Sequence, residues 1–292
     1  MDISVLEKLN AQVKKFNADA TPGVESFLFL GYVGTGKTTL IATIPAKRTF
    51  FHFFEPNGPA AIARLKHCEY KEFLPKRLLT TLKPIPKEGA KGSGFVSKGA
   101  DVFREFENFF VKALDSGFYD QYDVVAIDSL TTLQEAMLDD VLARDNRMGF
   151  APERNDRSLV GFQLRNLLLS ALSIDRIVCA CAHLNYEQDD ETKRLMHMPI
   201  LVGQQKTKTP QVFTNVFICE YEPVGNDVKY FVRSIGDNKT MFNLKRSARF
   251  SWIDVRQEVT IKEWGNLQSQ GLGKLFKEAE TRMKGGTVTP KA

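Results

Sequence analysis

Eight residues near the N-terminus have the types and the spacing of a phosphate-binding loop. The segment Gly31-Tyr32-Val33-Gly34-Thr35-Gly36-Lys37-Thr38 matches G-x-x-x-x-G-K-[ST], the P-loop or Walker A motif. In this motif the glycines allow the backbone to curl so that its N–H groups face an anion. The lysine, here Lys37, reaches the β- and γ-phosphates, and the Thr38 hydroxyl binds Mg²⁺. The predicted binding residues are Gly31, Val33, Gly34, Thr35, Gly36, Lys37, Thr38 and Thr39.

The segments on either side of this loop are those needed to hold it in place. Phe27–Leu30 is a short apolar run typical of a buried strand, and residues 39–44 predict the first turns of a helix. Strand, loop and helix therefore occur in the order that the motif requires. This context distinguishes a nucleoside triphosphate site from an ordinary glycine-rich turn.

A second acid is needed beside the loop, because Mg²⁺ must also be held from the sheet. Asp128 ends an apolar strand predicted over 122–129, and this position brings it to the carboxyl edge of the sheet beside Thr38. An aspartate here is also typical of a helix N-cap, and both roles are compatible. Asp123 begins the same strand and therefore points to the opposite end.

Two further side chains stand where they could act on the γ-phosphate. Glu55 ends the strand predicted over 48–54, and its carboxylate could orient or deprotonate water. His183 ends the strand predicted over 176–183, where it either senses the phosphate by a hydrogen bond or is an ordinary strand-end residue. Lys37, Glu55, Asp128 and His183 are the candidate catalytic residues.

The composition is that of an ordinary globular protein. The 292 residues are 43% hydrophobic and 26% charged, with a formal net charge of +5. No apolar run approaches the ~20 residues of a membrane span, and the N-terminus lacks a signal-type stretch, so we expect a cytoplasmic protein without a membrane partner. The four cysteines lack zinc-type spacing. The charge is too small to indicate nucleic acid on its own.

Strands that alternate with helical patterns predict an α/β fold with a mainly parallel sheet and added strands near the C-terminus. Helical spacing of apolar residues predicts an amphipathic helix before the core. A segment rich in proline, glycine and lysine predicts an exposed insertion in the core. The predicted organisation is a helix in 1–20, a core in 21–265 with an insertion at 75–100, a helix in 266–284 and a disordered tail in 285–292.

Three segments after the P-loop carry a family resemblance. Phe50–Glu55, Ile127–Thr131 and Val178–His183 follow the loop in the order and rough spacing of the RecA-like recombinase core. The chain resembles the short, phage-encoded RecA-like ATPases, some of which are single-strand annealing proteins, over about residues 22–255. The resemblance implies that Glu55 activates water, that Asp128 serves the metal, and that His183 replaces a glutamine that couples the γ-phosphate to DNA.

The same resemblance implies two DNA-binding loops, at 143–158 and 184–211, and a basic pair, Lys245 and Arg246, that reaches the nucleotide of the next subunit. Cations in the loops could meet phosphates, and Phe150 and Tyr186 could stack on bases. The mixed charge equally fits two solvated surface loops. The candidate DNA-binding residues are Arg144, Arg147, Arg154, Arg157, Lys193, Arg194, Lys206 and Lys208.

We therefore expect an ATPase that uses ATP and Mg²⁺ and hydrolyses ATP slowly, with stimulation by DNA. It would form a homo-oligomer, as a ring or filament, and bind single-stranded DNA in recombination, annealing or replication, with a single-stranded DNA-binding protein as a further partner. One alternative is a P-loop nucleotide or small-molecule kinase, whose arginine-rich lid would be the 143–158 loop. Another is a nucleotide-gated binding protein with little turnover, which the same residues would serve.

Overall fold

The computed structural model describes most of the predicted core. It covers residues 25–75, 84–85, 94–95, 101–148, 150–188, 193, 195–234, 244–253 and 255–284. Outside these residues lie the predicted N-terminal helix, the C-terminal tail, Arg194 and most of the 75–100 insertion. Within the insertion, Pro84–Ile85 (β4) and Gly94–Phe95 (β5) pair antiparallel.

One large sheet organises the described residues. Its nine strands are β1 (Ser26–Gly31), β2 (Thr49–Phe53), β3 (Cys68–Glu72), β6 (Val124–Asp128), β7 (Ile177–Gln188), β8 (Leu195–Pro199), β9 (Asn215–Val224), β10 (Asp227–Arg233) and β11 (Arg256–Glu258). The order is β11-β10-β9-β1-β7-β6-β2-β3, and β8 pairs with β7. The strands from β9 to β3 are parallel, whereas β10 and β11 add antiparallel pairs.

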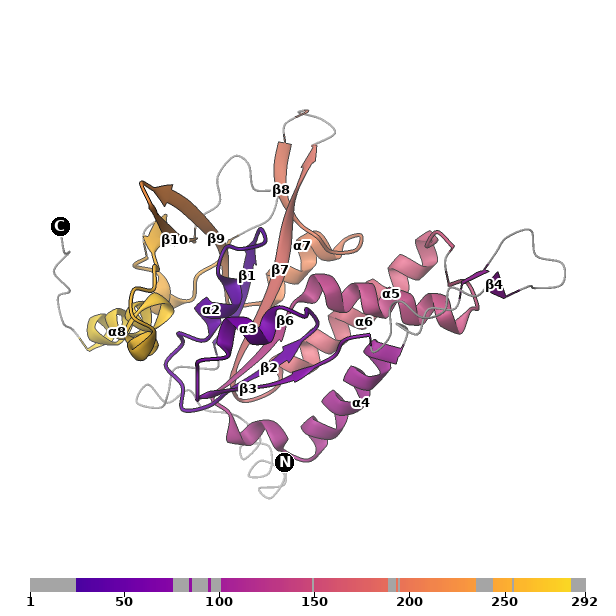
Figure 1. The fold of residues 1–292 in the computed structure, drawn as a ribbon, viewed down its shortest axis with the longest axis horizontal. Helices are drawn as coiled ribbons and strands as arrows, with labels where there is room; N and C mark the ends of the chain where they lie inside the picture. Colours follow the sequence, from indigo (N-terminus) through magenta and orange to yellow (C-terminus); the bar gives the residue numbers. More distant parts are fainter. Residues whose placement is uncertain are drawn as a thin grey trace, which may run out of the picture.

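The register brings the ends of separate strands to one edge. Gly31 pairs with His183, and Phe53 pairs with Asp128, so β1, β2 and β6 end at nearly the same level. Strand β7 does not stop there. It continues past the sheet and turns back as β8, and this hairpin projects at the top of Figure 1. The carboxyl edge of the sheet is therefore where the P-loop, Glu55, Asp128 and His183 meet.

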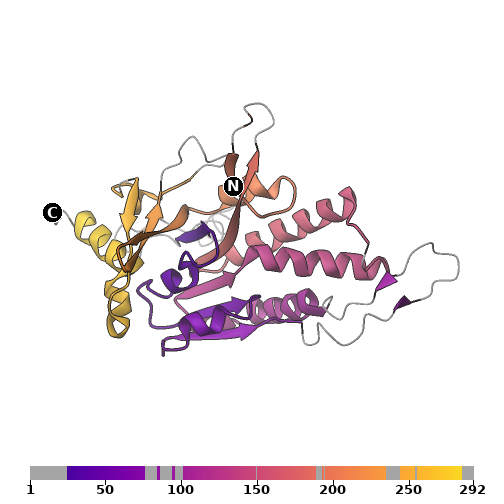
Figure 2. The ribbon, with the colours of Figure 1, turned by 45° about the horizontal axis from the view of Figure 1, so that its top comes forward.

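Alternating side chains of the strands face two helical layers. Phe27 and Phe29 point to one core cluster, and Leu28 and Leu30 point to the other. The cluster with the leucines is covered by α4 (Asp101–Asp115), α5 (Leu130–Arg144), α6 (Arg154–Leu172) and α7 (Gln205–Val212), and the first three run side by side in Figure 2. The cluster with the phenylalanines is covered by α2 (Lys37–Ile41), α3 (Gly58–Ile62) and α8 (Gly271–Met283).

The predicted architecture is confirmed: the described residues form an α/β core with a mainly parallel sheet, flanking helices and additional C-terminal strands. None of the described helices is long and apolar enough to cross a membrane.

The first predicted DNA-binding loop is shorter than expected. Within 143–158, α5 continues to Arg144 and α6 begins at Arg154, so only the residues between them form a loop. A capping box starts α6 early, because the Glu153 N–H donates to Oδ2 of Asp156 at 2.7 Å. Arg154 and Arg157 therefore lie on a helix, and the prediction of a loop there was wrong.

The second predicted loop, 184–211, is mostly regular structure. Its first part is the β7–β8 hairpin, in which Tyr186 lies opposite His197, and its last part is α7. The end of β7 is polar over residues 185–188, and β8 is a short strand interrupted by His197, so neither shows the apolar run by which the buried strands were predicted. Strand β3 was also missed, because it is a polar strand at the edge of the sheet.

Candidate nucleotide-binding site

The P-loop connects β1 to α2 in a conformation that requires its glycines. Gly34 and Gly36 have φ angles of 81° and 78°, which side chains other than glycine rarely adopt. A Cβ on Gly31 would lie 2.7 Å from the carbonyl oxygen of Cys219 on β9. Val33, at the outer turn of the loop, is 81% exposed. The loop backbone therefore curls at the open edge of the sheet.

The amine of Lys37 lies inside this loop. Its Nζ donates to the carbonyl oxygens of Gly31, at 3.0 Å, and Tyr32, at 2.9 Å. Nζ also lies 3.4 Å from Nδ1 of His183. Because an ammonium can only donate, Nδ1 of His183 accepts here and Nε2 carries the ring proton. The structure thus brings two of the predicted catalytic residues into contact.

Thr38 and Asp128 meet across the site. The Thr38 hydroxyl donates to Oδ2 of Asp128 at 2.5 Å. Burial raises the pKa of the Asp128 carboxyl, whereas the hydrogen bond from Thr38 and the charge of Lys37 act in the opposite direction. Oxygen ligands of these types are the ones that Mg²⁺ takes beside a bound phosphate. The two residues fit the predicted metal role.

Glu55 is held by one of its two carboxylate oxygens. Oε1 accepts from Ser129 Oγ at 2.6 Å, from His183 Nε2 at 2.8 Å and from Thr132 Oγ1 at 3.1 Å. These bonds, with that from His183 largest, lower the pKa of Glu55 to about 2 against the opposing effect of burial. Glu55 is therefore an ionised carboxylate that contacts His183 and lies near Asp128.

Sequence reasoning missed the hydroxyls that support this group. Ser129 and Thr132 bind Glu55, and Thr131 Oγ1 accepts the backbone N–H of His183 at 2.9 Å. All three follow Asp128 directly, in Asp128-Ser129-Leu130-Thr131-Thr132. The sequence signal that could have revealed them is this series of hydroxyl side chains directly after Asp128. The backbone turns there from β6 into α5, with a cis peptide bond between Asp128 and Ser129.

An aromatic cluster joins the P-loop to the β7–β8 hairpin. The Tyr32 hydroxyl lies 3.2 Å from Nδ1 of His197, and the ring of Tyr186 lies 5.5 Å from that of Tyr32. Burial raises the pKa of the Tyr32 hydroxyl. Tyr186, which the sequence offered as a base-stacking residue, is half exposed and packs on His197 at 4.8 Å. Strand β7 and the hairpin thus contact the P-loop at two points, through His183 with Lys37 and through His197 with Tyr32.

An apolar pocket opens beside the P-loop on the α2 and α8 face. It has a volume of about 130 Å³. The ring of Tyr230 lies against Gly36, within 3.4 Å of the place that a Cβ would take, and Trp264 is 47% exposed. The lining residues are Thr35, Gly36, Thr39, Leu40, Tyr230, Val259, Ile261 and Trp264.

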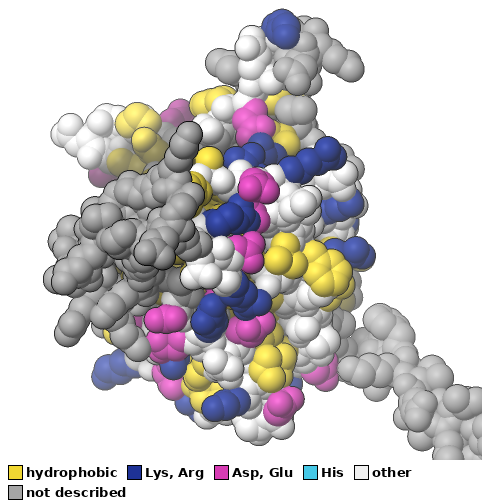
Figure 3. Space-filling model, turned by 90° about the vertical axis from the view of Figure 1, so that its right-hand side faces the viewer, with side chains coloured by type: hydrophobic (Ala, Val, Ile, Leu, Met, Phe, Trp, Pro, Cys, Tyr) yellow, Lys and Arg dark blue, Asp and Glu magenta, His cyan; other side chains and the backbone are white. Residues whose placement is uncertain are grey.

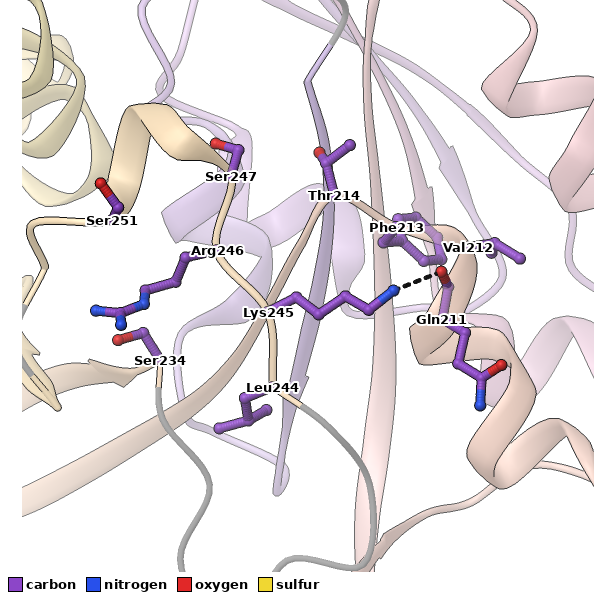
Figure 4. Close-up of a pocket in the computed structure, with 10 residues that line it drawn as sticks. All are labelled: Gln211, Val212, Phe213, Thr214, Ser234, Leu244, Lys245, Arg246, Ser247 and Ser251. Carbon is purple, nitrogen blue, oxygen red and sulfur yellow. Dashed lines mark hydrogen bonds between the residues drawn. The ribbon is translucent and has the colours of Figure 1, made fainter. Parts of the chain in front are cut away.

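Lys245 and Arg246 lie away from the P-loop. Lys245 pairs with Val216 near the beginning of β9, and its Nζ donates to the carbonyl oxygen of Gln211 at 2.7 Å. Arg246 points in the opposite direction and donates to the carbonyl oxygen of Ile253 (Figure 4). Both line an open pocket of about 870 Å³, to which no described P-loop residue contributes.

Several of the predicted DNA-binding cations are paired with acids. Arg144 binds the buried Asp140 at 2.5 Å, Arg147 binds Glu153 at 3.1 Å as well as Asp145 and Asp156, and Lys206 binds Glu187. Lys193 lies beyond β7 with a φ angle of 57° and is exposed. On the face shown in Figure 3, Lys and Arg side chains are likewise intermixed with Asp and Glu.

Three other predicted cations, Arg154, Arg157 and Lys208, line a groove between α6 and the start of α7. The groove has a volume of about 640 Å³, and Phe162 beside it is 61% exposed. Its charged lining is entirely basic. Arg165 was not among the predicted residues, although it lies on the same face of α6 as Arg154 and Arg157. The charged and aromatic lining residues are Arg154, Arg157, Phe162, Arg165 and Lys208.

No protein-family model matches the chain, and no curated protein sequence matches it. Among solved structures, the chain is similar to the flagellar accessory protein FlaH from Methanocaldococcus jannaschii, with 10% identity, a TM-score of 0.39 and coverage of 82% of this chain and 87% of that chain. It is also similar to the KaiC-like protein PH0186 from Pyrococcus horikoshii OT3, with 14% identity, a TM-score of 0.37 and coverage of 77% and 84%. We infer the function from the geometry of the site.

Proposed function

We propose that the chain is a Mg²⁺-dependent ATPase that oligomerises and binds single-stranded DNA. The observation that supports it most is the meeting of Lys37, Thr38, Asp128, Glu55 and His183 at one edge of the sheet. These side chains come from four separate elements and include a cation, two carboxylates, a hydroxyl and an imidazole. That set is what phosphoryl transfer to water needs.

Each side chain has a distinct part in the reaction. The N–H groups of the loop and Lys37 bind the phosphates, Thr38 and Asp128 hold the metal, and Glu55 orients the attacking water. The water oxygen forms a bond to the γ-phosphorus while the bond to the β–γ bridging oxygen breaks, and the water proton leaves with the phosphate. A pKa of about 2 makes Glu55 a weak base, so orienting the water is its main contribution.

The apolar pocket beside the loop is the place for the nucleoside. Thr39 and Gly36 connect the phosphate side of the site to Tyr230 and Trp264, whose rings offer stacking surfaces to a base. The lining contains hydroxyls but no amide or carboxylate side chain. ATP is the proposed substrate because the family that the sequence resembles uses it.

The α6–α7 groove is the proposed site for single-stranded DNA. Arg154, Arg157, Arg165 and Lys208 offer cations to successive phosphates, and Phe162 offers a surface for a base. This proposal replaces the two-loop assignment, since Arg144, Arg147 and Lys206 already form ion pairs. Lys245 and Arg246 are proposed to contact the nucleotide of an adjacent copy, because they line a pocket away from their own P-loop.

ATP hydrolysis with and without single-stranded DNA, at low and moderate salt, tests the proposal. Lys37→Ala is the blank, since it removes the amine that the phosphates need. We expect turnover that DNA stimulates and that salt reduces. Turnover that DNA does not stimulate, together with no DNA binding at low salt, would contradict the proposed binding of single-stranded DNA. Turnover that requires an added nucleoside monophosphate or other phosphoryl acceptor would instead indicate a kinase.

A further inference from the structure

The contacts of Glu55 single out two neighbouring hydroxyls. A carboxylate oxygen has about two lone-pair sites, and Oε1 already has three donors within 3.1 Å. No hydrogen bond from the described residues ends at Oε2. Among the described residues, Oε2 is therefore left free to accept from a further donor, such as a water molecule. Whatever fixes Oε1 also fixes the direction in which Oε2 points.

Ser129 and Thr132 hold Oε1 from the interior of the protein. Ser129 is fully buried, whereas the Glu55 side chain is 32% exposed. Ser129 Oγ accepts the backbone N–H of Thr132 at 3.3 Å as the N-cap of α5, and its one proton goes to Glu55. Thr132 Oγ1 lies 3.2 Å from Ser129 Oγ and donates to Glu55. The start of α5 thus holds Oε1 of the carboxylate by two hydrogen bonds.

The same turn connects the metal site to the water site. Asp128 ends β6 and binds Thr38, and Ser129, the next residue, binds Glu55. Adjacent residues therefore set the positions of both carboxylates relative to the P-loop. A misplacement of about 1 Å at such a site can lower a rate by about a hundredfold.

We propose that Ser129 and Thr132 are positioning residues for Glu55: they hold Oε1 and leave Oε2 to bind and orient the water that attacks the γ-phosphate. The proposal rests on the ATPase activity proposed above. It gives the hydroxyls a role that His183 alone cannot fill, since His183 also contacts Lys37. Movement of the imidazole toward a bound phosphate would leave the two hydroxyls as the remaining donors to Oε1.

The groups around Glu55 fix the expected effect of pH. His183 from β7 faces it, Asp128 from β6 and Glu135 from α5 are the nearby acids, and Lys37 from α2 lies behind His183. Removal of a hydroxyl donor makes the ionised form of Glu55 less favourable and raises its pKa. The acid limb of the kcat profile should therefore move to higher pH in a variant that lacks either hydroxyl.

The decisive pair of variants is Thr132→Val and Thr132→Ser, compared with Thr281→Val as the matched control. Thr281 is exposed on α8, and its hydroxyl binds only the carbonyl oxygen of Lys277. We expect Thr132→Val to lower kcat by about tenfold or more while KM for ATP stays within about twofold. Thr132→Ser, which keeps the donor, should recover most of kcat, and Thr281→Val should match wild type.

A kcat for Thr132→Val within about twofold of wild type, or a Thr132→Ser variant as slow as Thr132→Val, would overturn the proposal. If Thr132→Val does not fold, Thr132→Ala takes its place, and Ser129→Ala should shift kcat and the acid limb in the same direction. Wild-type turnover no faster than Lys37→Ala would refute the ATPase itself. Normal wild-type turnover with unaffected Thr132 variants would refute only the positioning role.

Discussion

The Thr38 hydroxyl donates a 2.5 Å hydrogen bond to Oδ2 of Asp128, joining residues that are 90 positions apart in the chain. One partner belongs to the P-loop, and the other ends β6. Strand β7 lies between β1 and β6 in the sheet, so the bond spans a strand at the carboxyl edge. Sheet order, and not sequence proximity, brings the two metal-binding candidates together.

Asp128→Asn should raise the Mg²⁺ concentration needed for half-maximal ATP turnover by about tenfold or more, because the amide lacks the charge that attracts the ion. A titration of Mg²⁺ at fixed ATP measures the effect. Asp123→Asn is the matched control: Asp123 lies just before the same strand, at the opposite edge, and binds the backbone N–H of Lys47 at 2.6 Å. An unchanged Mg²⁺ requirement in Asp128→Asn would exclude Asp128 from the metal site.

Trp264→Ala should weaken ATP binding by about tenfold, since base–aromatic stacking contributes about 1–3 kcal/mol. Inorganic tripolyphosphate carries the phosphates without the nucleoside, so its affinity should not change. Calorimetry with both ligands separates the two contributions. Tyr70→Ala, at a half-exposed tyrosine on the edge strand β3, is the control. Equal losses for ATP and tripolyphosphate would show that Trp264 supports the loop and not a base.

Arg165→Ala and Lys208→Ala should each weaken single-stranded DNA binding and reduce the slope of log K against log salt by about 0.7, the value for one phosphate contact on a single strand. Fluorescence anisotropy over a salt series gives both quantities. Arg176→Ala is the control, because Arg176 is outside the groove and lies near Asp120 at 3.5 Å. Wild-type slopes in both groove variants would exclude the groove as the DNA site.

His52 should make the protein less stable in mild acid. Burial among the phenylalanine rings of α4 lowers the pKa of His52 from 6.5 to about 4. The hydrogen bond of His52 to the Ala126 carbonyl acts in the opposite direction. Between these pH values the unfolded chain binds a proton that the folded chain excludes, so the folded state loses stability as the pH falls. The loss in the free energy of unfolding should reach about 3 kcal/mol.

Urea denaturation from pH 7 to pH 4 measures this slope. His52→Gln removes the titrating group and should flatten the profile over that window, whereas His67→Gln, the control at a half-buried histidine, should keep the wild-type slope. A His52→Gln profile that runs parallel to wild type would show that other groups cause the loss in acid.

Asp140→Asn should destabilise the fold by about 2–3 kcal/mol, because the carboxylate is fully buried between two arginines. Arg104 of α4 and Arg144 of α5 each bind it at 2.5 Å, so the group joins two helices. The midpoint of chemical unfolding is the measurement. Asp115→Asn, at an exposed position on α4, should stay within about 0.5 kcal/mol of wild type. Similar midpoints for the two variants would exclude a structural role for the ion pairs of Asp140 with Arg104 and Arg144.

The sequence predicted the sheet-forming core because its strands carry their own signals. The apolar runs at β1, β2, β6 and β7 are each buried on both faces, and such strands can be recognised without knowing their partners. The acids and the histidine at the strand ends followed from the same pattern. Their roles remain predictions, although the structure brings them together.

The errors arose where structure depends on a partner that is distant in sequence. In the β7–β8 hairpin the end of β7 is polar and β8 is short, and the pairing of Tyr186 with His197 becomes visible only in three dimensions. Arg147 read as a free cation, yet it binds three carboxylates around the start of α6. Arg165 read as an ordinary helical residue, because nothing in the sequence places α7 beside α6. The role of each charged side chain therefore depends on the neighbours that the fold gives it.

The position of the sheet between the proposed nucleoside pocket and the proposed DNA groove has a thermodynamic consequence. The pocket lies on the α2 and α8 side, and the groove lies on the α6 and α7 side, and the two have no lining residue in common. Any influence between them is a linkage free energy carried by the protein. Linkage is reciprocal: the factor by which ATP changes the affinity for a DNA strand equals the factor by which the strand changes the affinity for ATP.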